Sequence, residues 1–265
     1  MTSLKDTQNE RDDRRIPIDR VGVKDVRFPL SIRDRNHAPQ HTVATVNMAV
    51  DLPHHFKGTH MSRFVEVLHS HGRELTVASV AAMSKELLTR LHAEKAHVEI
   101  RFPYFRTKKA PVTQAEGLLD YGVVMEVNAE GQDDIDFVLT VEVPVTTLCP
   151  CSKAISERGA HNQRGLLTLS VRFREPVWIE DLIELVEASA SSELYSVLKR
   201  PDEKAVTERA YDNPVFVEDL VRNVALKVSA QKLIKWFRVE AVNYESIHNH
   251  NAWAVIEQKV PSSAD

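Results

Sequence analysis

The chain has 265 residues, 43% of them hydrophobic and 27% charged, which is enough apolar material for one large or two small globular domains. Its 34 lysines and arginines against 38 acidic residues give a net charge of −4, so no basic excess is available to bind nucleic acid or an anionic membrane. No apolar run approaches the roughly 20 residues that span a bilayer, and the polar residues 1–15 resemble neither a signal peptide nor a membrane anchor. We therefore expect a soluble, cytoplasmic protein with a polar, disordered tail over residues 1–20.

Alternation of apolar and polar residues indicates several strands, each with one buried face. In the first half of the chain this pattern predicts strands at residues 26–32, 42–52, 98–102 and 121–127. Helical spacing between the second and third of these strands predicts a short helix from Phe64 and a longer helix over residues 77–91. The order is therefore strand, strand, helix, helix, strand, strand.

The second half repeats this order of elements without a strong repeat of residues. Strands are predicted at residues 135–143, 167–173, 237–241 and 252–256. Helices are predicted at residues 182–186 and 217–228, the second of them after the cap formed by Asn213 and Pro214. A turn at residues 130–134 joins the two modules, which we place at residues 21–131 and 132–260, followed by a tail at 261–265.

These patterns predict an α+β fold in which each module is an antiparallel sheet with both helices on one face. Such a sheet leaves its other face to be covered, either by the other module or by further chains that join their strand edges into a barrel. We therefore expect a homo-oligomer whose sites lie between subunits.

The most specific segment is residues 144–165, where a strand ends and a polar connector of about 15 residues precedes the next strand. A connector of this length in a compact domain is usually functional. It holds both cysteines of the chain, Cys149 and Cys151, together with His161 and Lys153. Cations near a thiol favour the thiolate, which is the form that attacks carbon or binds metal. Two small buried hydrophobes or a redox pair are the alternatives, and the spacing alone leaves them open.

A second cluster, Glu245, His248 and His250, lies between the last two predicted strands. The two histidines share a face if the chain is extended there, although histidine pairs on protein surfaces are common. Alongside Cys149 and His161 they favour a metal site, because thiolate, imidazole and carboxylate together suit Zn²⁺ or another first-row divalent ion.

Three further features have weaker support from spacing. Glu203 follows an Arg-Pro-Asp sequence, and Glu218 lies near the start of the last predicted helix, but most glutamates on helices are simply solvated. Lys57, His60 and Arg63 lie between a strand and a helix, where cations and backbone amides at a helix start favour an anion site. An ordinary polar loop is the alternative there.

Taken together, these segments resemble the type IB GTP cyclohydrolases, the prokaryotic metal-dependent form of GTP cyclohydrolase I. The resemblance covers nearly the whole chain beyond the tail. It rests on four segments, at residues 25–30, 57–63, 144–165 and 249–252. It implies the tunnelling fold, in which two ββααββ modules per chain assemble into an oligomeric barrel.

The activity that the resemblance implies is hydrolysis of GTP to 7,8-dihydroneopterin 3'-triphosphate and formate, the first step of pterin and tetrahydrofolate biosynthesis, which also feeds deazaguanine pathways. The implied cofactor is a divalent metal ion, Zn²⁺, Mn²⁺ or Fe²⁺. By resemblance, Cys149 is the key thiolate, and with His161 and Glu203 it forms the metal set. Cys151 is an alternative ligand.

The resemblance also implies how the substrate is held. Glu218 corresponds to the carboxylate that anchors the guanine edge, and His248 and His250 are ligands or proton carriers. The triphosphate needs cations, which we expect from residues that neighbouring subunits can share: Lys57, His60, Arg63, Lys153 and Arg164. The implied partners are GTP and further copies of the chain, as a tetramer with sites at the subunit interfaces.

Two other functions are compatible with the same residues. A nitrile reductase of the deazaguanine pathway would use a cysteine to attack a nitrile and NADPH to deliver hydride, but the paired cysteines and the two nearby histidines favour metal-dependent hydrolysis. A binding protein with a structural metal would be non-catalytic, and its ion would have four protein ligands and no water.

Overall fold

The computed structural model describes residues 7–8 and 10–261. The chain divides into two compact units: Met1–Phe102 with Val124–Val138 is unit 1, and Pro103–Val123 with Leu139–Asp265 is unit 2. The predicted boundary at residue 131 does not coincide with this division. The reason is that three long strands, β4 (Lys95–Lys109), β5 (Glu116–Glu130) and β6 (Asp134–Leu148), contribute residues to both units.

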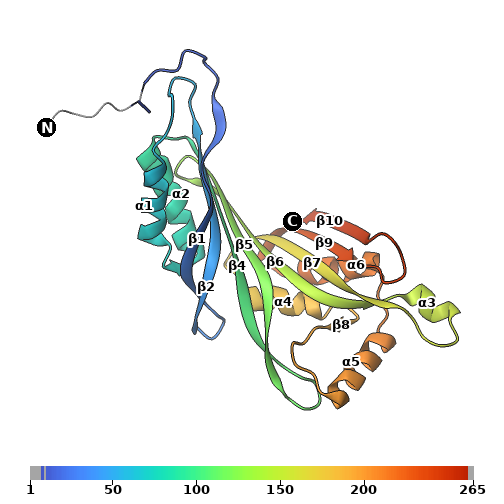
Figure 1. Cartoon of the computed structure of the whole chain (residues 1–265). Helices are drawn as coiled ribbons and strands as arrows, with labels where there is room; N and C mark the ends of the chain where they lie inside the picture. The colour runs from blue at the N-terminus through green and yellow to red at the C-terminus, as the bar shows by residue number, and fades with distance from the viewer. Residues whose placement is uncertain (1–6, 9, 262–265) are drawn as a thin grey trace. The chain divides into compact units, whose positions relative to one another are not determined.

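Unit 1 has the predicted order of two strands, two helices and two strands, with one short strand, β3, between the helices that was not predicted (Figure 1). Its strands follow the order β5-β4-β2-β1-β3, in which β1 and β2 form an antiparallel pair and β3 runs parallel to β1. Helices α1 and α2 pack together and contact β1 and β2. The elements outside the shared strands are β1 (Ile18–Arg33), β2 (Pro39–Leu52), α1 (Met61–His71), β3 (Glu74–Leu75) and α2 (Val77–Leu91).

The segment before β1 makes defined contacts where the structure describes it. The Gly58 amide donates to the Gln8 carbonyl, and the Gln8 side chain donates to the Thr59 carbonyl. Lys57 Nζ lies 2.8 Å from Glu10 Oε2. The expected tail at residues 1–20 is therefore tied to the loop before α1 at these points, and β1 already begins at Ile18. The rest of the two expected tails, residues 1–6, 9 and 262–265, lies outside the described residues.

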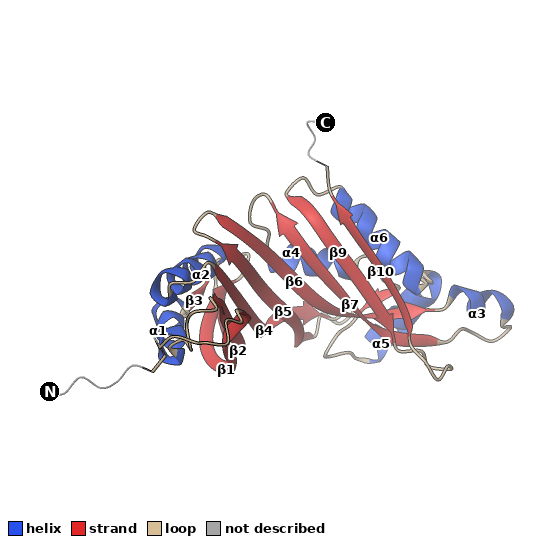
Figure 2. Ribbon diagram, turned by 90° about the horizontal axis from the view of Figure 1, so that it is seen from above, coloured by secondary structure: helices blue, strands red, loops and turns tan. Residues whose placement is uncertain are grey.

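Unit 2 has four antiparallel strands in the order β10-β9-β7-β6, followed by its parts of β5 and β4. Helices α4 and α6 pack against each other and against β7 and β9 (Figure 2). No helix in the described ranges is long and apolar enough to cross a bilayer. The elements are α3 (Pro150–Ile155), β7 (Asn162–Phe173), α4 (Ile179–Glu187), β8 (Ser192–Glu193), α5 (Arg200–Asp212), α6 (Val217–Ser229), β9 (Ile234–Asn243) and β10 (Ala252–Lys259).

The helices α3 and α5 were not predicted from the sequence. Most residues of α5 are exposed, and only Asp202 and Ala210 are buried, so this helix has no apolar stripe to reveal its period. Asp202 begins α5 by accepting hydrogen bonds from the backbone amides of Val112, Thr113 and Lys199. Burial acts to raise the pKa of Asp202, but these hydrogen bonds and that of the Thr113 hydroxyl hold it well below its ordinary value.

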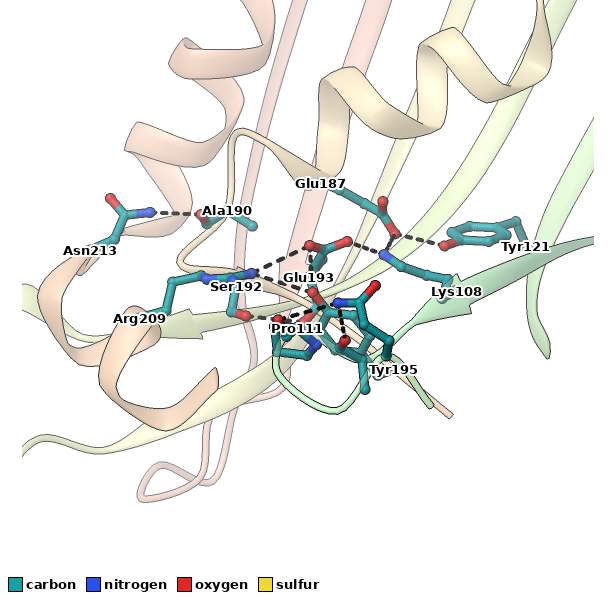
Figure 3. Close-up of polar contacts among 12 residues, drawn as sticks. Lys108, Pro111, Tyr121, Glu187, Ala190, Ser192, Glu193, Tyr195, Arg209 and Asn213 are labelled. Carbon is teal, nitrogen blue, oxygen red and sulfur yellow. Dashed lines mark hydrogen bonds and ion pairs between the residues drawn. The ribbon is translucent and has the colours of Figure 1, made fainter. Parts of the chain in front are cut away.

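A network of buried ion pairs holds the segment after α4 (Figure 3). Lys108 Nζ on β4 lies 2.7 Å from Glu187 Oε1 and also pairs with Glu193. The Tyr121 hydroxyl donates to Glu187 at 2.6 Å, and the Tyr195 hydroxyl donates to Glu193 at 2.7 Å. Burial and its bond to Glu193 raise the pKa of Tyr195 to about 12, so both tyrosines act as donors at neutral pH.

This network positions the end of β6. Glu193 pairs with Val145 in the short antiparallel ladder between β8 and β6. The Leu148 amide, at the last residue of β6, donates to Ser191 Oγ at 3.0 Å. The residues directly after Leu148 are therefore positioned by the segment after α4, which Lys108 anchors.

Replacing Lys108 by methionine should destabilise unit 2 strongly. The Lys108 and Glu187 side chains are only 9% and 7% exposed, so the variant leaves a buried carboxylate without its cation. Breaking a buried pair costs about 3–5 kcal/mol, which corresponds to a fall in Tm of roughly 10 °C. The matched control is Lys109→Met on the same strand, because Lys109 and its partner Glu116 are largely exposed and their pair contributes little. Equal melting temperatures for the two variants would contradict the role of the network.

Candidate functional site

The connector between β6 and β7 closes into a hairpin whose neck is formed by Cys149 and His161. The antiparallel pairing of the two strands ends at Leu148 opposite Asn162. One residue further, the Cys149 amide donates to the His161 carbonyl at 3.1 Å. Two residues that are 12 positions apart in the sequence are therefore neighbours because of the strand register.

Cys149 is the N-cap of α3, and Pro150 takes the first helical position, where its missing N–H is not needed. The Ser152 amide points at Cys149 Sγ, with an N–S distance of 3.4 Å. The His161 amide donates to Ser152 Oγ at 3.2 Å, which ties the two sides of the connector together. Cys149 is half-buried, whereas Cys151 is exposed on α3.

The second cluster of the sequence, between β9 and β10, lies next to this neck. β9 pairs with β7 so that Asn243 is opposite Gly165, and the Tyr244 amide donates to the Arg164 carbonyl. The ring centroids of His161 and His248 are 6.3 Å apart, and the His248 and His250 rings stack at 5.1 Å.

These segments surround a pocket of about 250 Å³, which we call the Cys149 pocket. It lies between the ends of β7, β9 and β10 and the first turn of α6. Its lining residues come from the two connectors, from the strand ends beside them and from the segment that begins α6: Cys149, His161, Gln163, Val215, Phe216, Val217, Glu218, Asn243, Glu245, His248, His250 and Ala252.

Hydrogen bonding defines which nitrogen of His161 faces outward. Nδ1 lies 2.9 Å from Gln163 Oε1, and the Gln163 side-chain amide in turn donates to Thr147 Oγ1 at 2.8 Å. Because Gln163 uses its N–H group on Thr147, its oxygen accepts from His161 Nδ1. The neutral ring then carries its proton on Nδ1, and the lone pair on Nε2 is left for a ligand or a proton. Glu245 Oε2, 3.9 Å from Nδ1, lies on the same side as Gln163.

The start of α6 forms another part of the pocket lining. Glu218 in its first turn is exposed, and its side chain makes no ion pair within the described part of the chain. A carboxylate at this position is favoured by the helix dipole. Phe216, the N-cap residue, is 40% exposed and adds an aromatic surface. At the floor, Asn243 is 2% exposed, and its Oδ1 is buried without a hydrogen-bond partner.

The structure does not bring Glu203 to this pocket. Glu203 follows Asp202, which points into the turn between β4 and β5, and consecutive helical residues point about 100° apart. Glu203 is therefore exposed on the outer face of α5. Among the described residues, no group of three or more His, Cys, Asp and Glu side chains is close enough to hold a metal ion. Of the expected set of Cys149, His161 and Glu203, the structure therefore brings only Cys149 and His161 together.

The expected phosphate-binding cations also lie outside the lining of the pocket. In unit 2, Lys153 Nζ donates to the Tyr211 carbonyl and lies 4.3 Å from the centroid of the Tyr211 ring, and Arg164 is exposed on β7. In unit 1, Arg63 donates to the Arg90 carbonyl at 2.8 Å, and Lys57 pairs with Glu10 as described above. His60 is the residue directly before α1.

Sequence reasoning did not assign roles to three pocket residues: Glu245, Gln163 and Asn243. The sequence indicated Glu245 only as the carboxylate of the cluster with His248 and His250, without a specific role. Asn243 had a signal that was not used, because it continues the inward register of Phe237, Val239 and Ala241, where an apolar residue is expected. Gln163 had no comparable signal, since its role depends on its bonds to His161 and Thr147.

Comparison with known families gives one match over most of the chain. The model of the family described as type I GTP cyclohydrolase FolE2 matches residues 4–254. Proteins named GTP cyclohydrolase FolE2 are similar over nearly their full lengths. The protein of Akkermansia muciniphila is 64% identical over 264 residues, covering 99% of this chain and 100% of the relative. That of Geotalea uraniireducens is 55% identical, with 96% and 93% covered, and that of Nitrosococcus oceani is 54% identical, with 97% and 96% covered.

Among solved structures, the chain is similar to urate oxidases. The uricase of Arthrobacter globiformis gives a TM-score of 0.50 at 9% identity, with 93% of this chain and 94% of that chain covered. The urate oxidase of Bacillus sp. TB-90 also gives 0.50, at 10% identity, with 91% and 99% covered. At such low identity the likeness concerns the fold alone, and it confirms the predicted α+β tunnelling fold.

Gly165→Ala should lower the stability of unit 2 through a single contact. A Cβ at this position would lie 2.8 Å from Asn243 Oδ1, which real Cβ atoms do not tolerate. Overpacking of this kind costs about 1–3 kcal/mol, so thermal unfolding should show a fall in Tm of roughly 5 °C. The double variant Gly165→Ala/Asn243→Ala removes the clash and should melt close to Asn243→Ala alone. If the double variant shows the sum of both losses, the clash is not the cause.

Proposed function

The chain belongs to the FolE2 family of type I GTP cyclohydrolases, and on that premise we propose that the Cys149 pocket is where it hydrolyses GTP to 7,8-dihydroneopterin 3'-triphosphate and formate. This reaction opens pterin and tetrahydrofolate biosynthesis. The observation that carries the proposal is that Cys149, His161 and Glu218, from three separate segments, line one pocket. The family resemblance implies a role in GTP hydrolysis for each of them.

We propose that the reaction depends on a divalent ion, Zn²⁺, Mn²⁺ or Fe²⁺, bound by Cys149 and His161. The donor chemistry fits, because a thiol and an imidazole suit these ions. The hydrogen bonds of His161 fit as well, because a ligating histidine usually donates its other ring N–H to a fixed oxygen, and Gln163 supplies that oxygen. When bound, the ion would acidify water and so supply a nucleophile for guanine C8 at neutral pH.

Glu203 remains our proposal for the carboxylate ligand, and Glu245 is given a different role. The ion would lie on the Nε2 side of His161, whereas Glu245 lies near Nδ1 at 3.9 Å. Glu245 therefore orients and polarises the imidazole, and the ligand carboxylate must come from elsewhere. Glu203 is exposed on α5 and meets this requirement if ion binding or a neighbouring chain brings it to the pocket. Cys151 is the second candidate ligand.

The other residues of the pocket suit the substrate. Glu218 would accept from guanine N1–H and the exocyclic amine in a bidentate, charge-assisted pair. His248 and His250, which line the pocket with stacked rings, would carry protons during ring opening, rearrangement and reclosure. Cys149 would bind the ion, and its thiolate would place a negative charge next to guanine C8.

The size of the pocket supports a site completed by a second copy of the chain. Its 250 Å³ is below the roughly 300–1,000 Å³ of typical ligand pockets, and a nucleoside triphosphate is a large ligand. Among the residues that the structure describes, no lysine or arginine lines it. We propose that a homo-oligomer, a tetramer, completes the site, and that Lys57, His60, Arg63, Lys153 and Arg164 supply the charges for the triphosphate across subunits.

Purified protein with GTP and Mn²⁺ or Zn²⁺ should release formate together with a product that oxidises to a fluorescent pterin. Cys149→Ala should reduce this turnover by more than about 100-fold while remaining folded, because it removes a ligand and not a core contact. Cys151→Ala is measured in parallel, and retention of activity within about threefold assigns the ligand role to Cys149 alone. Absence of both products with every metal tested would overturn the proposed function.

Metal affinity separates the roles of the two carboxylates. Glu203→Gln should weaken binding of Mn²⁺ to the chelator-treated protein by more than about 100-fold, because it removes a direct ligand. Glu245→Gln should weaken it less, by about 10- to 100-fold, which is the usual effect of losing an outer partner of a ligating histidine. Isothermal titration with Mn²⁺ alone measures both. Wild-type affinity in Glu203→Gln would exclude this residue from the metal set.

A further inference from the structure

Asn243 is the polar group that the preceding account leaves unexplained. It ends the inward row of β9, in which Phe237, Val239 and Ala241 are fully buried. Its own side chain is equally buried, at 2% exposed, yet Oδ1 has no hydrogen-bond partner. A buried acceptor without a donor costs about 1–3 kcal/mol relative to a satisfied one. An apolar side chain of the same shape would avoid that cost.

The surroundings keep space for this oxygen. Gly165 lies opposite Asn243 in the ladder between β7 and β9, and any larger residue there would collide with Oδ1. Asn243 also lines the Cys149 pocket together with Glu218. The residue that carries the unpaired acceptor therefore belongs to the lining of a candidate ligand site.

The hydrogen-bond inventory of guanine indicates what would satisfy this acceptor. The guanine base has three N–H donors, one on N1 and two on the exocyclic amine. A bidentate pair with a carboxylate uses N1–H and one amine hydrogen. One amine hydrogen is left, and the Cys149 pocket holds one buried acceptor without a donor.

From this match we propose that Asn243 is a specificity residue, whose Oδ1 accepts a hydrogen bond from the exocyclic amine of guanine that Glu218 leaves free. This assignment rests on the proposed function, because it assumes that the base of GTP enters the Cys149 pocket. A site that binds a group by a buried hydrogen bond rejects analogues that lack the group, since the buried partner is then left unpaired. Asn243 therefore adds discrimination between guanine and hypoxanthine.

Asn243→Leu tests this assignment through two opposite effects. Removing an unsatisfied buried polar group should leave Tm unchanged or raise it by a few degrees. The KM for GTP should rise roughly 10–100-fold, because the amine loses its acceptor. Inosine triphosphate lacks that amine, so its Ki as a competitor of GTP should change by less than about threefold. A purely structural role would lower Tm and would not separate the two nucleotides.

Two further variants keep the test decisive. Asn243→Asp retains an oxygen at this position and should keep the KM for GTP within about threefold of wild type. Asn223→Leu is the matched control, because the side chain of Asn223 on α6 already donates to the Ser189 carbonyl and does not line the pocket. It should lower Tm and leave both nucleotide constants unchanged.

The outcomes distinguish this inference from the proposed function. If the wild type hydrolyses GTP and Asn243→Leu has the same KM for GTP, or shifts GTP and inosine triphosphate equally, Asn243 does not read the amine and only this inference is wrong. If the wild type neither turns over nor binds GTP, the proposed function has failed, and the inference fails with it.

Discussion

The register between β6 and β7 is the constraint on which the candidate site depends. It ends at Leu148 and Asn162, and the amide of Cys149 then bonds to the carbonyl of His161. This backbone contact makes the residue that carries the thiol a direct neighbour of the residue that carries the imidazole. The rest of the lining of the Cys149 pocket comes from the start of α6, the connector after β9 and the strand ends that hold Gln163 and Asn243.

Most of the fold follows from periodicity. The eight predicted strands and the helices α2, α4 and α6 have clear apolar patterns, and the structure contains all of them, although the strands are longer than predicted. The two-residue strands β3 and β8 were not predicted. The helices that were missed, α3 and α5, share a physical reason. α3 has six residues and none of them is buried, while α5 is held by the hydrogen bonds of Asp202 and has only one other buried residue, Ala210. Neither helix needs an apolar stripe, so neither has a periodic signal.

The candidate site was predictable from the sequence only in part. Residue types and spacing indicated Cys149, His161 and the two later histidines, and the family resemblance added Glu218. All of them line one pocket. Gln163 and Asn243 were not indicated, because their significance lies in which hydrogen bonds they make or lack across strands. Such information depends on register, which a single sequence specifies only through its alternating pattern. The exposed position of Glu203 depends likewise on how Asp202 begins α5.

The hairpin neck has a consequence for variation in this protein. The β6–β7 ladder and the bond between Ser152 and His161 together fix how far apart Cys149 and His161, the two proposed metal ligands, lie. The number of residues in the rest of the connector does not affect that separation. The exposed stretch at residues 155–158 could lengthen or shorten without displacing either donor. Insertions should therefore be tolerated there, whereas a single residue added to β6 or β7 would turn one donor to the opposite side of the sheet.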